Sequence, residues 1–96
     1  MKVNICGIPH DVEIRDDTFT SNEMHMGEIR YKECKIYLSS GMPKALEKET
    51  LVHEMLHGIF VHLGHNDLAS DEVLVQSLAQ AISQGFEVKK YEGAKI

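Results

Sequence analysis

The chain has 96 residues, 43 % of them hydrophobic, which is enough for one domain with a modest core, and we expect residues 1–96 to form it. Its net charge of −5, with no basic cluster longer than Lys89-Lys90, argues against nucleic-acid binding. No apolar run approaches the roughly 20 residues that span a bilayer, and the N-terminus lacks the apolar stretch of a signal peptide, so we expect a cytoplasmic protein without membrane partners.

The first forty residues favour strands. Short apolar runs and alternation of apolar with charged residues predict strands at 3–6, 12–15, 26–31 and 33–38. The last two are separated by almost nothing and predict a tight hairpin. Residues 16–22 form a polar break before it. Two isolated cysteines, Cys6 and Cys34, predict buried free thiols in a reducing compartment.

Two helices are expected after residue 42. Pro43 suits the first turn of a helix that extends through residue 63 and stops at Gly64. A loop over 65–69 leads to a second helix, with Ser70 as its N-cap and acidic residues in its first turn. Its expected core-facing stripe comprises Val73, Leu74, Val75, Leu78, Ala79, Ala81, Ile82 and Phe86. The prediction is an α+β domain, with a small, mostly antiparallel sheet packed against two long helices.

The motif H-E-x-x-H lies within the first of these helices and comprises His53, Glu54 and His57. Residues four apart in a helix are separated by about 40° around its axis and about 6 Å along it, so both imidazoles can bind one metal ion. The intervening glutamate faces the water that such an ion would carry. This is the ligand and base arrangement of a zinc hydrolase, and we predict Zn²⁺ bound by His53 and His57 with Glu54 as the catalytic base.

The alternative is that the motif is a chance match, which is expected in ~4 % of chains of this composition. The histidines would then be incidental residues of a charged helix. The neighbouring residues argue against it, because they make the helix apolar nearly all round and therefore mostly buried. Unpaired buried polar groups cost several kcal/mol, so two histidines and a glutamate in such a helix indicate a partner.

A catalytic zinc site needs a third protein ligand and an open position. The candidates after the first two histidines are Glu72, Asp71, His65, His62 and Asp67. His62 is about 180° round the helix from His53 and points away, whereas His65 follows Gly64, where the chain can curl back. The metzincin spacing is excluded, because its glycine and third histidine would fall at Phe60 and Leu63.

A family resemblance favours Glu72. Residues 36–82 resemble the ImmA/IrrE-type metallopeptidases, small zinc enzymes of mobile elements, phages and bacterial regulatory operons. Their second motif, E-x-x-A-N-x-F-A on the helix after H-E-x-x-H, is matched by Glu72 to Ala79, with Val75, Gln76 and Leu78 replacing Ala, Asn and Phe. The resemblance implies a minimal, zincin-like member with Glu72 as the third zinc ligand. Gln76, one turn after Glu72, either hydrogen-bonds a ligating imidazole or faces solvent.

The predicted function is a gluzincin-like zinc metallopeptidase. Glu54 would take a proton from water and pass it to the leaving amine, and a strand within residues 28–38 could bind an extended peptide substrate by edge pairing. The oxyanion-stabilising residue is not identified, although five side chains are chemically able, namely Tyr31, Tyr37, His62, His65 and Tyr91. The alternatives are a non-catalytic zinc-binding module that acts as a regulatory or interaction protein, and a metal-free regulatory domain. The oligomeric state stays open.

Overall fold

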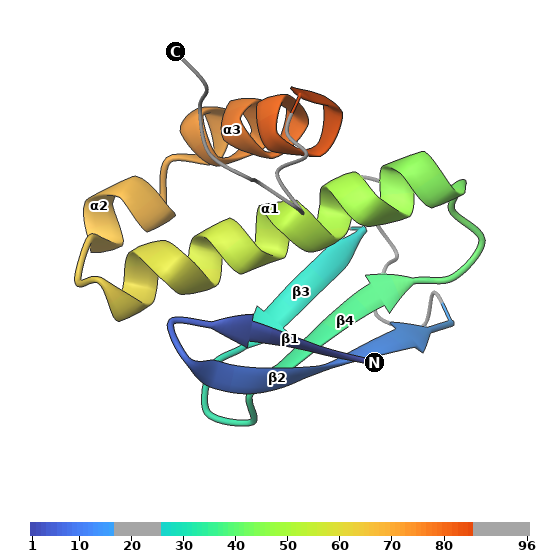
Figure 1. The fold of residues 1–96 in the computed structure, drawn as a ribbon, viewed down its shortest axis with the longest axis horizontal. Coiled ribbons are helices and arrows are strands. Elements are labelled where there is room, and N and C mark those ends of the chain that lie inside the picture. The colour runs from blue at the N-terminus through green and yellow to red at the C-terminus, as the bar shows by residue number, and fades with distance from the viewer. Residues whose placement is uncertain (17–25, 86–96) are drawn as a thin grey trace, which may run out of the picture.

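The computed structural model describes residues 1–16 and 26–85, and these ranges contain four strands and three helices (Figure 1). In chain order the elements are β1 (Lys2–Ile5), β2 (Ile8–Arg15), β3 (Gly27–Arg30), β4 (Lys35–Ser39), α1 (Lys44–His62), α2 (Asn66–Ala69) and α3 (Glu72–Gly85). The predicted α+β class is confirmed. Most of the predicted polar break over 16–22, together with Phe86 and Tyr91, lies outside the described residues.

The four strands form one mixed sheet in the order β1-β2-β4-β3. The β1–β2 and β3–β4 pairs are antiparallel, so the predicted hairpin at the second pair is confirmed. The pairing of β2 with β4 is parallel, and this parallel pair was not specifically predicted. Strand β3 is at one end of this order, so its outer edge is free of any described strand.

Helix α1 lies between the sheet and α3 (Figure 1). Towards the sheet it covers Ile5, Ile36 and Leu38, which are at most 2 % exposed. On its other side Leu56 packs with the buried Val75 and Ala79 of α3. This two-sided packing explains why α1 is apolar nearly all round, since a helix with one wet face would carry a narrower apolar stripe.

Two glycines let α1 and the sheet approach each other closely. A Cβ atom on Gly27 of β3 would lie 2.8 Å from Thr50 Cγ2, and one on Gly58 of α1 would lie 3.0 Å from both Ile5 Cδ1 and Ile29 Cδ1. Real Cβ atoms essentially never show the first distance and rarely the second. The absence of these side chains therefore sets the spacing between β3 and the turns of α1 that carry H-E-x-x-H.

The helices differ from expectation in three respects. The expected loop over 65–69 contains the short helix α2, which lies between α1 with 19 residues and α3 with 14 described residues. Ser70 ends α2, where its hydroxyl donates to the Asp67 carbonyl, so it is not the N-cap of α3. Asp71 takes that place, because its Oδ1 accepts from the backbone N–H of Leu74 at 3.0 Å. Val73, expected in the core, is 81 % exposed.

Both cysteines are free, as expected, but the prediction that they are buried is wrong. Cys6 is exposed and Cys34 is half-buried. Each lies in a turn between strands with a positive φ, 50° and 53° respectively, and such turns lie at the surface. Within the described ranges, no helix combines the length and the apolar character that crossing a membrane requires.

Candidate metal centre

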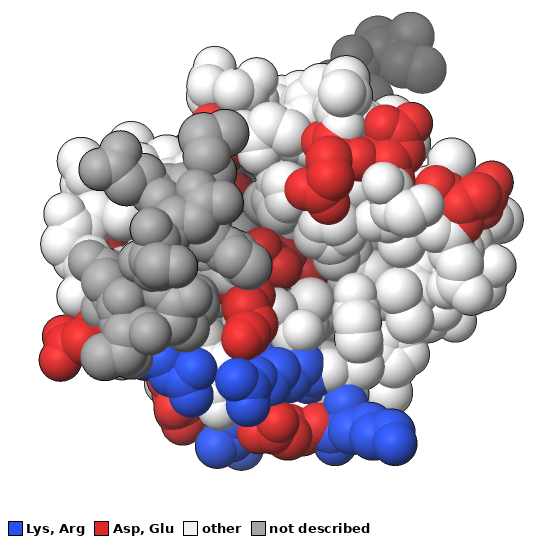
Figure 2. All heavy atoms as spheres, turned by 180° about the vertical axis from the view of Figure 1, so that it is seen from behind, with Lys and Arg blue, Asp and Glu red and all other residues white. Residues whose placement is uncertain are grey.

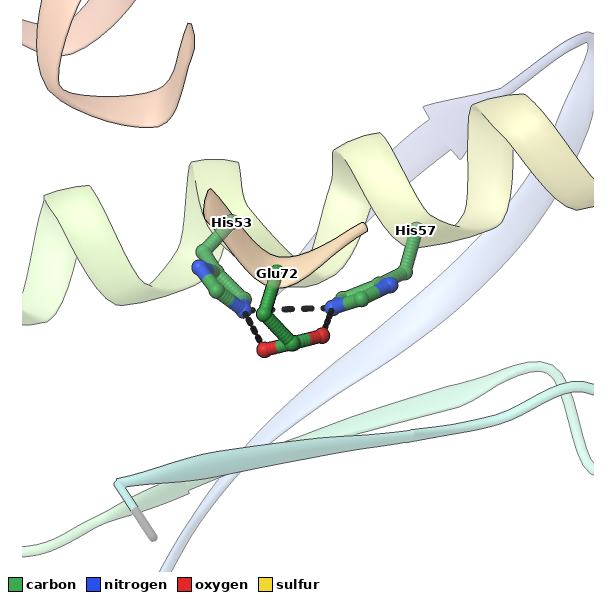
Figure 3. A group of neighbouring side chains, drawn as sticks. All are labelled: His53, His57 and Glu72. Carbon is green, nitrogen blue, oxygen red and sulfur yellow. Dashed lines mark hydrogen bonds and ion pairs between the residues drawn. The ribbon is translucent and has the colours of Figure 1, made fainter. Parts of the chain in front are cut away.

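Three side chains from two helices converge on one point. His53 and His57 lie on successive turns of α1, and their Nε2 atoms are 3.1 Å apart (Figure 3). Glu72, the first residue of α3, points its carboxylate at both rings, with Oε1 2.8 Å from His57 Nε2 and Oε2 3.4 Å from His53 Nε2. The structure thus brings together the three residues that the sequence predicted as metal ligands.

The spacing of these donor atoms fits a small divalent cation. Tetrahedral Zn²⁺, with bonds of about 2.0–2.2 Å to nitrogen and oxygen, places neighbouring donor atoms about 3.3–3.5 Å apart. The separation of 3.4 Å lies in that range, whereas those of 3.1 and 2.8 Å are shorter than its lower limit by about 0.2 and 0.5 Å. Two imidazoles and a carboxylate are also a ligand set that zinc favours. The group could therefore hold a metal ion with little rearrangement.

A hydrogen bond orients the first histidine. His53 Nδ1 lies 2.7 Å from Gln76 Oε1, one turn along α3 from Glu72, so of the two alternatives for Gln76 the structure has the contact with an imidazole of the motif. Gln76 Nε2 in turn donates to Glu49 Oε2 at 3.2 Å. Glu49 was not singled out in the sequence. Its position one helical turn before His53 is the signal that could have identified it.

Glu54 lies beside the three converging side chains with its carboxyl group buried. It is 8 % exposed and has no hydrogen-bond or ion-pair partner among the described residues. Burial raises the pKa of Glu54 to about 7, with further increases from the charges of Glu72 and Glu28, whereas His53 opposes the shift. A buried carboxyl group without a described partner, next to side chains that could hold a metal ion, is the feature expected of a general base.

These side chains open into a cavity of about 660 Å³ between β3, α1 and α3. One wall is formed by β3 and the turn that follows it, including Ile29 and Tyr31. Four carboxylates line the cavity, from Glu28, Glu49, Glu54 and Glu72, and no described Lys or Arg does. Figure 2 shows acidic side chains over the middle and upper part of one face, and Lys and Arg along its lower edge. The cavity therefore has a negative electrostatic character.

The other candidates for the third ligand lie elsewhere. Among the described residues, only Glu72 forms a group with His53 and His57. The Asp71 carboxylate caps α3, and the ring of His62 packs edge-on against His10 with centroids 6.2 Å apart. His65 and Asp67 lie at the start of α2.

Of the side chains considered for oxyanion stabilisation, Tyr31 lines the cavity. Burial raises the pKa of its hydroxyl, and the charges of Glu54 and Glu72 raise it further, so the hydroxyl keeps its proton near neutral pH. Tyr37 is 4 % exposed and lies beneath the guanidinium of Arg15, which is 3.8 Å from its ring centroid. Of the two described tyrosines, only Tyr31 lines the cavity.

None of the protein-family models, curated proteins or solved structures with which the chain was compared matches it.

Proposed function

We propose that this protein is a zinc-dependent metallopeptidase with a zincin-like fold, related in its site to the ImmA/IrrE-type enzymes that its two motifs resemble. The supporting observation is the convergence of His53, His57 and Glu72 at donor separations of 2.8–3.4 Å, beside the buried, unpartnered carboxyl group of Glu54. Three ligands with a neighbouring glutamate base are the protein contribution to zinc-assisted hydrolysis.

The residues divide the chemistry between them. His53, His57 and Glu72 would hold Zn²⁺, which supplies Lewis-acid polarisation of a carbonyl and lowers the pKa of water to ~7. Glu54 accepts a proton at its carboxylate from the attacking water and returns it to the nitrogen of the leaving amine. Tyr31 donates a hydrogen bond from its hydroxyl group to the carbonyl oxygen of the substrate as negative charge develops on that oxygen.

The substrate is an extended peptide that pairs with the free edge of β3. Strand β3 ends the sheet and contributes Gly27, Glu28 and Ile29 to the cavity wall. Edge pairing presents a peptide backbone to the site through main-chain hydrogen bonds. The acidic lining favours substrates with Lys or Arg near the cleaved bond, because opposite charges attract most strongly where water is partly excluded.

Replacement of the base tests the proposed reaction. We expect the zinc-loaded protein to cleave members of a mixed peptide library, detected by mass spectrometry. Glu54→Gln should retain about one zinc per chain but lose about 10²–10⁴-fold in cleavage rate. Glu13→Gln, at a half-exposed position on β2 that pairs with Lys35, is the matched control and should cleave at the parent rate.

The outcomes separate the alternatives. Cleavage by Glu54→Gln at the parent rate would contradict the mechanism. Zinc binding without cleavage of any peptide would instead support a non-catalytic zinc-binding module. A protein that binds no zinc would remove both interpretations.

A further inference from the structure

A chain of two hydrogen bonds runs from Glu49 on α1 through Gln76 on α3 to His53. The Glu49 Oε2 to Gln76 Nε2 distance is 3.2 Å, and the Gln76 Oε1 to His53 Nδ1 distance is 2.7 Å. All three side chains are half-buried. Glu49 precedes His53 by one turn, and Gln76 follows Glu72 by one turn. The two hydrogen bonds therefore lie alongside the point where His53, His57 and Glu72 converge.

We propose that Glu49 is a positioning residue of the metal site, which sets the tautomer of His53 by fixing the orientation of the Gln76 amide. The inference rests on the metal site of the proposed function but is independent of peptide hydrolysis.

The argument begins with the amide. The two ends of a glutamine amide have nearly the same shape, so its orientation is decided by its hydrogen-bond partners. The Oε2 atom of Glu49 accepts the hydrogen bond, so the NH₂ end of Gln76 must face it. The carbonyl end then faces His53 Nδ1 and also only accepts, so Nδ1 must carry the ring proton.

The tautomer determines whether His53 can bind a cation. With the proton on Nδ1, Nε2 presents its lone pair to the point where His57 Nε2 and the Glu72 carboxylate converge. The reversed amide would place its NH₂ against Nδ1 and move the ring proton to Nε2. That proton would point at the position of the ion and would have to be lost before binding. Glu49 thus favours metal binding without contacting the metal.

Zinc affinity provides the first test, measured by competition with a chromophoric chelator. We expect Glu49→Ala to weaken zinc binding about 10-fold or more, in the range seen for residues that support metal ligands. Glu49→Gln should lose no more than about 3-fold, because its amide oxygen accepts from Gln76 in one of the two orientations that the amide can take. Glu47→Ala, which removes an acid from the first turn of the same helix outside the metal-site cavity, is the matched control and should bind as the parent does.

A double-mutant cycle and a tautomer measurement complete the test. Gln76→Ala should weaken zinc binding to a similar extent, and the Glu49→Ala/Gln76→Ala double variant should lose little more, because both act through one hydrogen-bond chain. In the metal-free protein, ¹⁵N NMR of the imidazoles should show His53 with its proton on Nδ1 in the parent. Glu49→Gln should show a smaller share of this tautomer, because its amide can present either end to Gln76. Glu49→Ala should show a mixture of tautomers.

Three results would overturn the inference. The first is an unchanged zinc affinity in Glu49→Ala. The second is a loss of zinc affinity in Glu49→Gln as large as that in Glu49→Ala, which would indicate a role for charge alone. The third is an unchanged tautomer of His53 in metal-free Glu49→Ala. The NMR measurement needs neither metal nor activity, so it tests Glu49 even if the parent binds no zinc, an outcome that would remove the proposed function separately. If Glu49→Ala does not fold, the inference is tested by comparing the zinc affinity and the His53 tautomer of Glu49→Gln with those of the parent and of Gln76→Ala.

Discussion

Glu72 Oε1 lies 2.8 Å from His57 Nε2, so the first residue of α3 reaches the second histidine of the α1 motif. The glutamate side chain is 67 % exposed, and its position depends on where α3 begins. Asp71 fixes that beginning by capping the helix through Leu74. A metal bound by these residues would join α1 to α3 and stabilise their packing, because binding to the folded state alone raises the free energy of unfolding.

The identity of the third ligand can be tested by zinc retention. We predict that Glu72→Ala weakens zinc binding more than about 100-fold, beyond the 10–100-fold effect of a supporting residue. His65→Ala, at the start of α2, should leave the affinity within a few-fold of the parent. Dialysis against a graded series of chelator concentrations measures both. The opposite ranking would transfer the ligand role to His65.

The buried carboxyl group of Glu54 predicts a pH dependence of stability in the metal-free protein. Its folded-state pKa is raised to about 7 from 4.5, so between these values the folded state keeps a proton that the unfolded state has lost. The free energy of unfolding should therefore fall as pH rises from 4.5 to 7, by up to about 3 kcal/mol. Glu54→Gln should remove this fall and be the more stable protein at pH 8.

Urea unfolding of chelator-treated protein at pH 5 and pH 8 measures that difference. Comparison of the variant with the parent isolates Glu54 together with the charges that act on it, those of His53, Glu72 and Glu28, and Glu13→Gln controls for the loss of a carboxylate elsewhere. Parallel pH profiles for the parent and Glu54→Gln would contradict the burial argument.

Removal of the Tyr31 hydroxyl should slow catalysis without affecting the metal. We predict that Tyr31→Phe lowers kcat about 10²-fold, the usual loss for one oxyanion donor, with KM and zinc affinity little changed. Tyr37→Phe is the control, because that ring lies beneath Arg15 and does not line the cavity. A change confined to KM would assign Tyr31 to substrate binding instead.

The close approach of α1 to the sheet makes Gly58 intolerant of a side chain. Gly58→Ala would place a methyl group 3.0 Å from Ile5 and Ile29, so we predict a loss of about 1–3 kcal/mol in the free energy of unfolding. Gly85→Ala, at the last described residue of α3, would meet no described atom within 4 Å and should be neutral or stabilising by up to about 1 kcal/mol. Thermal unfolding of both variants compares them, and equal midpoints would show that the helix can shift away from the sheet.

The geometry of the histidine pair was predictable because it is local. The spacing of His53 and His57 along one helix determines their separation whatever the rest of the fold does. The contact with Glu72 depends on how two helices pack, and it was anticipated only through the resemblance of residues 72–79 to a known motif. The position of Gln76 one turn beyond Glu72 left two alternatives open, contact with an imidazole or exposure to solvent, and the helix packing decides between them.

The features that were missed depend on contacts between distant segments. Alternation of apolar and polar residues indicates a strand but not its partner, so the parallel pairing of β2 with β4, and hence the free edge of β3, could not be read from it. Glu49 looks like an ordinary helix-surface acid until α3 brings Gln76 against it. Cys34 lies in a turn with a positive φ, which residue-type statistics for buried thiols do not anticipate.

The central claim is that His53, His57 and Glu72 together hold one zinc ion, and elemental analysis with a high-resolution crystal structure of the zinc-loaded protein tests it most directly. The account predicts about one zinc per chain, with two imidazole Nε2 atoms and one Glu72 oxygen at about 2.0–2.2 Å from the metal. A protein that contains no zinc, or one in which zinc is held by other side chains while the two histidines lie apart, would contradict it.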